Sequence, residues 1–149
     1  MQPAAEIGRV CAVAGQCQRE MREWAKEYPG LFSAKPFDPA LFSTLALATA
    51  FSGPWLDSGR QRMANRATLW CFGLDWLMDY VAADRAEAAG IADRCLAVAE
   101  GATPVDGDEL TAFLADIRAE LAASDAYAVL GPIWRDELRR MLDAMVREH

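Results

Sequence analysis

The segment from Ala67 to Ala83, ATLWCFGLDWLMDYVAA, constrains the fold more than any other part of the chain. It is mostly apolar and contains no basic residue, yet it carries two aspartates, Asp75 and Asp79. Its length is marginal for crossing a membrane, and two carboxylates near the middle of a span would be costly in lipid. We therefore predict a buried helix inside a helical bundle, with its carboxylates facing a cavity that holds water or metal ions.

The rest of the sequence is also typical of helices. β-Branched residues never accumulate in alternation, whereas Ala, Leu, Met, Glu and Arg recur at helical spacing. A chain of 149 residues with 53% hydrophobic content can bury one core, and no linker or repeat divides it. The sequence therefore predicts an all-α protein of a single domain, residues 1–149.

Capping residues and Pro-Gly signals predict where the helices begin and end. Asp38 caps a helix that has Pro39 in its first turn and is nearly uncharged, so we expect it to be buried on most sides. We expect Asp57 or Ser58 to cap the helix that carries the aspartates. The other expected helices are 5–26, followed by a loop to Phe37, then 83–100, one that begins at Asp106 or Asp108 and ends near Ala123, and a last helix capped by Ser124 or Asp125 that kinks at Pro132.

Composition excludes several classes of function. The net charge of -7 and the pI near 4.7 argue against a nucleic-acid partner, because no cluster of Lys and Arg could neutralise phosphates. The amino terminus has no basic stretch before an apolar one, so it is not a secretory signal. The only histidine, His149, is terminal, which argues against a histidine-based site. No C-x-x-C pair suggests zinc, and reduced thiols favour a cytoplasmic location for the four cysteines, Cys11, Cys17, Cys71 and Cys95.

Asp75 and Asp79 are four residues apart, so on a helix their carboxylates lie on one face, close enough to share a cation. No Lys or Arg stands three or four residues away, and the nearest basic residues are Arg66 and Arg85. Charge compensation must therefore come from outside this helix. Mg²⁺ prefers carboxylate oxygens and keeps open positions for phosphates. We predict that Asp75 and Asp79 bind Mg²⁺ and, through it, a diphosphate.

A D-x-x-x-D spacing also arises by chance on wet helix faces, where the acids are merely solvated. The sequence WCFGLDWLMDY is too apolar and aromatic for such a face, which favours a functional site.

The run LWCFGLDWLMDY resembles the aspartate-rich motif of bacterial class I terpene synthases, which reads D-D-x-x-D or a shortened variant. Asp75 matches the first Asp and Asp79 the last, while Trp76 stands where the second Asp usually is. The Ser-Gly-Pro-Trp turn at 52–55 and the late stretch WRDELRRMLDAM also resemble that family.

The resemblance implies that the chain is the amino-terminal part of a class I terpenoid synthase α-domain, an antiparallel helical bundle. It implies a carbon-oxygen lyase that uses Mg²⁺ to ionise a prenyl diphosphate and then cyclises it, as diterpene cyclases do. The C20 geranylgeranyl diphosphate is the favoured substrate, with the C15 farnesyl diphosphate next. The expected catalytic and metal residues are Asp75 and Asp79. Phe72 is the first candidate for an aromatic pocket wall, followed by Phe51, Trp55 and Trp76, whereas Trp70 and Trp134 are expected in the core.

The family also has a second metal motif, N-x-x-x-S-x-x-x-E, and this chain has no match to it because its only Asn, Asn65, lacks the continuation. The helical period persists to the last turn, so the bundle is expected to be truncated. We therefore expect the chain alone to be inactive, with a complementary carboxy-terminal half or a second copy as partner.

Two other readings stay open. One is a noncatalytic helical module for ligand binding or dimerisation, and the other is a chain-elongating prenyl diphosphate synthase. The second normally has basic residues near the aspartates, and residues 67–83 contain none. Dependence on magnesium and diphosphate would separate the module from either enzyme.

Overall fold

The computed structural model describes residues 3–149, which form seven α-helices and one π-helical turn. No strand occurs among these residues, which confirms the predicted all-α class. Met1 and Gln2 lie outside the described residues. They begin the amino terminus, for which no secretory signal is predicted. The chain divides into two compact units, one ending at Cys71 and the other beginning at Phe72. Whether they belong to one α-domain stays a prediction.

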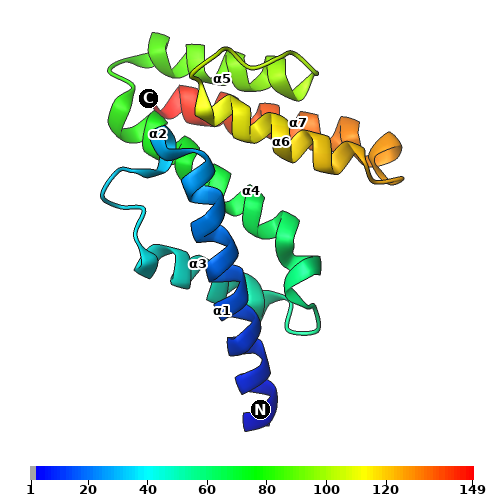
Figure 1. Cartoon of the computed structure of the whole chain (residues 1–149). Coiled ribbons are helices and arrows are strands. Elements are labelled where there is room, and N and C mark those ends of the chain that lie inside the picture. The colour runs from blue at the N-terminus through cyan, green and yellow to red at the C-terminus, as the bar shows by residue number, and fades with distance from the viewer. Residues whose placement is uncertain (1–2) are drawn as a thin grey trace. The chain divides into compact units, whose positions relative to one another are not determined.

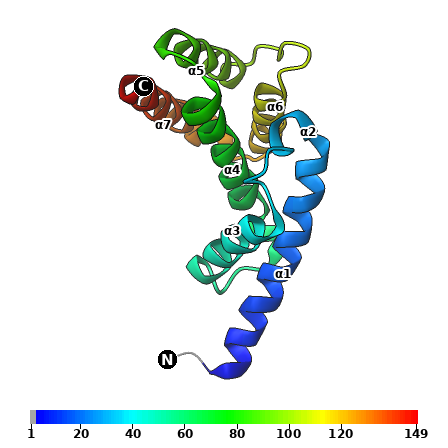
Figure 2. The same cartoon turned by 90° about the vertical axis from the view of Figure 1, so that its left-hand side faces the viewer.

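The first unit is built around helix α1 (Ala4–Glu27), which packs along helix α3 (Pro39–Ser52), as Figure 2 shows. Helix α1 buries one stripe of side chains three or four residues apart, the spacing that an amphipathic helix presents to a core. The buried residues of this stripe are Val10, Ala14, Cys17, Met21 and Trp24.

Helix α4 (Ser58–Trp76) begins in the first unit, where polar contacts fix its position. The guanidinium groups of Arg62 and Arg66 each lie 5.1 Å from the centre of the Trp24 ring, a cation–π geometry. Gln61 is 2% exposed, and its amide donates hydrogen bonds to the carbonyls of Gly53 and Leu56, each at 3.2 Å. These contacts attach the start of α4 to helix α1 and to the preceding turn.

Helix α3 begins as predicted, because the Asp38 carboxylate accepts a hydrogen bond from the Leu41 amide at 2.9 Å and Pro39 occupies the first turn. Its expected burial on most sides is wrong. One face is buried, while Leu47 and Phe51 are 39% and 44% exposed. The lack of charge comes from Ala, Ser and Thr, which tolerate water, and the Thr44 hydroxyl bonds back to a helix carbonyl.

Residues 29–37, expected as a loop, contain a short helix, α2 (Pro29–Phe32). Proline at the first helical position has a φ suited to a helix and no amide hydrogen to leave unpaired, so it can begin this turn. Leu31 and Phe32 are both buried.

The second unit contains the end of α4, the π-turn η1 (Leu77–Val81), and helices α5 (Arg85–Ala99), α6 (Glu109–Ala122) and α7 (Tyr127–Glu148). Helix α5 packs against both α6 and α7, and α6 and α7 run side by side (Figure 1). Their shared core is made of aliphatic side chains and one phenylalanine, among them Ile91, Val98, Leu110, Phe113, Leu114, Ile117, Leu138 and Leu142.

Side-chain caps set the starts of two helices in this unit, α5 and α6. The Asp84 carboxylate accepts from the Glu87 amide at 3.0 Å, and the Glu87 carboxylate accepts from the Ala83 amide, one residue before the cap, at 2.8 Å, an arrangement similar to a capping box. Asp108, one of the two predicted caps, accepts from the Thr111 amide at 3.2 Å.

The predicted cap of the last helix is wrong. Helix α7 follows Ala126 and has no side-chain cap, because the Ser124 hydroxyl accepts from the Ala126 amide within the preceding turn. The helix then runs through Pro132 to Glu148. Among the described residues, no helix is both long and apolar enough to cross a membrane.

Replacing Asp38 with alanine should lower the free energy of unfolding by about 1 kcal/mol, because the Leu41 amide loses its partner at the start of α3. Urea unfolding measures this change. The control is Asp106→Ala, which removes an exposed loop carboxylate and should leave stability within about 0.5 kcal/mol of the parent protein. Equal effects of the two substitutions would contradict a capping role for Asp38.

Candidate active site: a cavity with paired aspartates

The predicted helix over residues 67–83 is present, but only one side of it is buried. Leu74 and Met78 are 0% and 1% exposed and hold the inner face of the segment in the core. Asp75 and Asp79 each follow one of these anchors, so both fall on the adjoining exposed face. The segment therefore places the two aspartates together, one turn apart, at the boundary between core and solvent.

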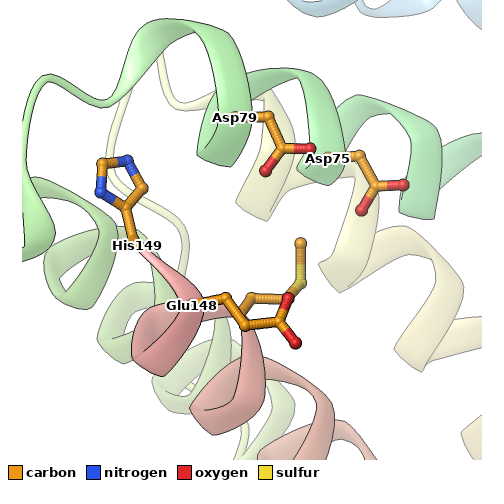
Figure 3. A pocket seen from close by; sticks show the side chains of 5 residues that line it. Asp75, Asp79, Glu148 and His149 are labelled. Carbon is orange, nitrogen blue, oxygen red and sulfur yellow. The ribbon is translucent and has the colours of Figure 1, made fainter.

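The two aspartates line a cavity of about 460 Å³ together with residues from the end of α7. Figure 3 shows both carboxylates extending from their helix toward the opposite wall, where Glu148 lies. Met145 and His149 complete the lining. One wall of the cavity thus carries two carboxylates. The opposite wall carries a thioether, a carboxylate and an imidazole.

The charge of the aspartate pair is uncompensated. Partial burial raises the pKa of Asp75, and the neighbouring negative charge of Asp79 raises that pKa further. Neither carboxylate takes part in a hydrogen bond or an ion pair with any residue between 3 and 149. The sequence prediction that this helix supplies no cation for its own acids agrees with this geometry.

The donor atoms of the pair suit a hard cation. Carboxylate oxygens are the ligands that Mg²⁺ prefers, and Mg²⁺ uses one or two of them while keeping water and phosphate as its other ligands. Within the described residues, no group of three or more His, Cys, Asp or Glu side chains could hold a metal ion. The paired aspartates therefore fit a cation shared with a phosphate ligand better than a closed structural site, and the Mg²⁺ assignment stays a prediction.

The aromatic candidates are distributed over both units. Phe72 and Trp76 belong to the same helix as the aspartates; Phe72 is 37% exposed, and Trp76 stacks on Tyr80 with ring centres 5.0 Å apart. Phe51 and Trp55 belong to the first unit and are 44% and 75% exposed. Their role as pocket walls stays a prediction.

The two tryptophans expected in the core differ in how far they are buried. Trp70 is 3% exposed, which confirms its core position, whereas Trp134 is only half-buried.

Sequence reasoning did not find the residues of the opposite wall. Glu148 and His149 follow Met145 by three and four residues at the end of α7, so helical spacing places both near it. The terminal position of His149 argues against a histidine-based site, yet its side chain lines the cavity. The helical spacing could have grouped these residues, but nothing in it indicates which distant helix they face.

Fold and site together define an all-helical protein with a cavity that carries paired aspartates. The chain is 29% identical over 133 residues to Ent-pimara-9(11),15-diene synthase from Streptomyces sp. (strain KO-3988). This match covers 87% of the chain and 43% of the relative, so the chain spans less than half of the relative's length. No protein-family model matches the chain. The chain is therefore a distant relative of a diterpene synthase over part of that protein.

Replacing Asp75 with asparagine should raise the Tm of the metal-free protein slightly, by at most about 2 °C. Because the pKa of Asp75 is raised by folding, its ionisation at neutral pH costs the folded state free energy that the unfolded chain does not lose. The difference should be present above the raised pKa and vanish below the ordinary carboxyl pKa, where Asp75 is protonated in both states.

This effect is measured by thermal unfolding, followed by circular dichroism. The pH runs from about 3 to about 8, a range that includes the titration of a carboxyl group. The control Asp93→Asn changes an exposed carboxyl on α5. A lower Tm for Asp75→Asn at neutral pH would show that the carboxylate has a stabilising partner, contrary to the interpretation above.

Proposed function

We propose that this chain forms the aspartate-rich wall of a class I terpene cyclase active site, which ionises and cyclises a prenyl diphosphate with Mg²⁺. The observation that carries the proposal is the uncompensated Asp75–Asp79 pair facing a cavity. The distant similarity to a diene synthase, together with the resemblance of the motif, supports this chemistry over other uses of a carboxylate pair.

In this proposal Asp75 and Asp79 bind Mg²⁺ through their carboxylate oxygens and so fix where the diphosphate docks. Mg²⁺ held by these carboxylates would supply positive charge that stabilises a diphosphate leaving group. The carboxylates stay ionised throughout, because protonation would release the metal. Their uncompensated charge in the metal-free protein is then the charge that the ligand neutralises.

The organic part of the substrate needs an apolar surface and a stabiliser for the carbocation. Met145 supplies apolar surface in the cavity. We propose that Phe72 is the first aromatic face near the cation, with Trp76, Phe51 and Trp55 as further contributors through cation–π attraction. The C20 geranylgeranyl diphosphate is the proposed substrate because the relative is a diterpene synthase, and the C15 farnesyl diphosphate is second.

A partner is part of the proposal. The chain spans 43% of the relative's length, and the second metal motif of the family has no match in it. We propose that a complementary helical polypeptide, or else a second copy of this chain, completes the cavity, and that the chain alone turns over little or no substrate.

A noncatalytic dimerisation module is the second candidate, favoured by one observation. Val129, Leu130 and Ile133 on α7 are 72%, 54% and 56% exposed, a concentration of apolar side chains that is typical of an association surface. Such a module would use this surface and would be indifferent to magnesium and diphosphate.

Magnesium together with inorganic diphosphate should raise the Tm of this chain, because a ligand that binds only the folded state stabilises it. At a ligand concentration about 100 times Kd the stabilisation is about 2.7 kcal/mol. Asp75→Asn should lose most of this rise, since one of the two proposed metal ligands is removed. Differential scanning calorimetry with each ligand alone and with both together measures the effect.

The control Asp93→Asn should respond as the parent protein does, because it removes one negative charge away from the cavity while leaving the aspartate pair intact. Absence of any rise in the parent protein would contradict the proposed diphosphate site and favour the dimerisation module. An equal rise in Asp75→Asn would place the binding elsewhere.

Prenyl diphosphates should bind more tightly than inorganic diphosphate in the presence of Mg²⁺, because each buried CH₂ group contributes up to about 0.8 kcal/mol. We expect geranylgeranyl diphosphate to bind most tightly, then farnesyl diphosphate, then inorganic diphosphate. Isothermal titration calorimetry gives this order. Equal affinities for all three would show that this chain contains no pocket for the isoprenoid chain.

A further inference from the structure

We infer that the π-turn η1 (Leu77–Val81) is a positioning element that brings the Asp79 carboxylate into line with that of Asp75. This inference rests on the proposed function, because alignment matters only if the two carboxylates bind one ligand. It assigns a role to a backbone feature that the sequence motif by itself does not contain.

The turn is defined by a hydrogen bond that spans five residues. The Ala82 amide donates to the Leu77 carbonyl at 2.8 Å, where an α-helix would use a partner four residues away. Asp79 lies inside this turn, whereas Asp75 lies in the regular helix just before it. The turn is the last one of this helix, because the backbone of Ala82 is extended. π-Turns occur at such helix ends, and inside helices they are frequently found at functional sites.

The local sequence does not explain the turn. Residues 77–81 read LMDYV and contain neither Gly nor Pro, the usual causes of a break in a helix. Leu77 and Met78 are good helix formers. Asp79, Tyr80 and Val81 are weaker helix formers, so helix propensity does not decide between an α-turn and a π-turn here.

Helix geometry gives the consequence for the two carboxylates. Each α-helical residue advances about 100° around the axis, so in an uninterrupted helix Asp79 would lie about 40° past Asp75. A turn closed over five residues has more residues in each revolution, so the advance for each residue is smaller. The turn therefore rotates Asp79 back toward the line of Asp75. In Figure 3 the two carboxylates extend to the same side of the helix and toward one cavity.

Packing holds the turn on two sides. Met78, in the turn, is 1% exposed and anchored in the core one turn after Leu74. On another face, Trp76 and Tyr80 stack across the junction between α-helix and π-turn, with an angle of 23° between their planes. These contacts hold two faces of the turn. The Asp79 side chain takes part in neither contact and lines the cavity.

Deletion of Tyr80 tests the inference directly. Without this residue, the same bond from the Ala82 amide to the Leu77 carbonyl closes an ordinary α-helical turn, and Asp79 shifts away from Asp75. The control is deletion of Ala83, which lies after the π-turn and shortens the connection to α5 by one residue; it removes the amide that donates to Glu87, so its stability is first compared with that of the parent protein. A further variant, Tyr80→Ala, keeps the number of residues in the turn but removes the ring that stacks on Trp76.

Binding of Mn²⁺, a paramagnetic substitute for Mg²⁺, is measured by electron paramagnetic resonance with and without inorganic diphosphate. We expect affinity to fall on the order of tenfold or more on deletion of Tyr80, the range seen when ligand-orienting groups are removed. The Ala83 deletion should stay near the parent value, whereas Tyr80→Ala should lose part of the affinity, because it removes one of the two contacts that hold the turn. If the Tyr80 deletion binds as tightly as the Ala83 deletion, the positioning role is wrong while the proposed function stands. If the parent protein itself binds no Mn²⁺, both fail.

A second measurement keeps the inference testable if the deleted protein does not fold. In the parent protein, Mg²⁺ with diphosphate should slow hydrogen exchange of the Ala82 amide more than that of the Ala123 amide, which closes the last turn of α6. Nuclear magnetic resonance reads both amides in one sample. Equal slowing at the two amides would mean that the ligand stabilises the fold generally and does not engage the π-turn, which overturns the inference.

Discussion

The uncompensated charge of Asp75 and Asp79 is the constraint on which the proposals about the second unit depend. Partial burial raises the pKa of Asp75, and the charge of Asp79 adds to this effect. No described residue pairs with either carboxylate. Both side chains lie on the exposed face of the helix, and no Lys or Arg stands three or four residues away from them in the sequence. Here buried Leu74 and Met78 hold the segment in place, and the ends of two helices enclose a cavity around the charge. The proposed metal and diphosphate give that unfavourable arrangement a physical reason.

In the first unit, a polar stretch of α4 packs beside α1. Trp24 lies against two guanidinium groups, and buried Gln61 satisfies two loop carbonyls. These contacts use the polar part of α4 for specific pairing, whereas the later part of the same helix leaves its charges without partners. One helix thus combines a part that makes structural contacts with a part for which a ligand is proposed. The proposed function, the proposed partner and the π-turn inference all concern the second part.

Much of the fold could be predicted from local signals. Asp38 with Pro39, and Asp108 before α6, act as caps because their side chains reach amides within the next turn, a purely local interaction. The prediction that Ser124 or Asp125 caps α7 is wrong because the Ser124 hydroxyl bonds inside its own turn. The predicted burial of α3 is wrong because low charge was taken as a sign of burial, although Ala, Ser and Thr also lie comfortably in water.

The sequence by itself determined that the chain is helical and that Asp75 and Asp79 share a helix face with no basic neighbour, because helical spacing is a local property. Only the tertiary structure decided that Met145, Glu148 and His149 form the opposite wall of the cavity, since residues far apart in sequence meet only through helix packing. It also decided that the helix ends in a π-turn that contains Asp79, which residues 77–81 do not indicate because they include neither Gly nor Pro. Local periodicity specifies which side chains share a face, and packing specifies what that face meets.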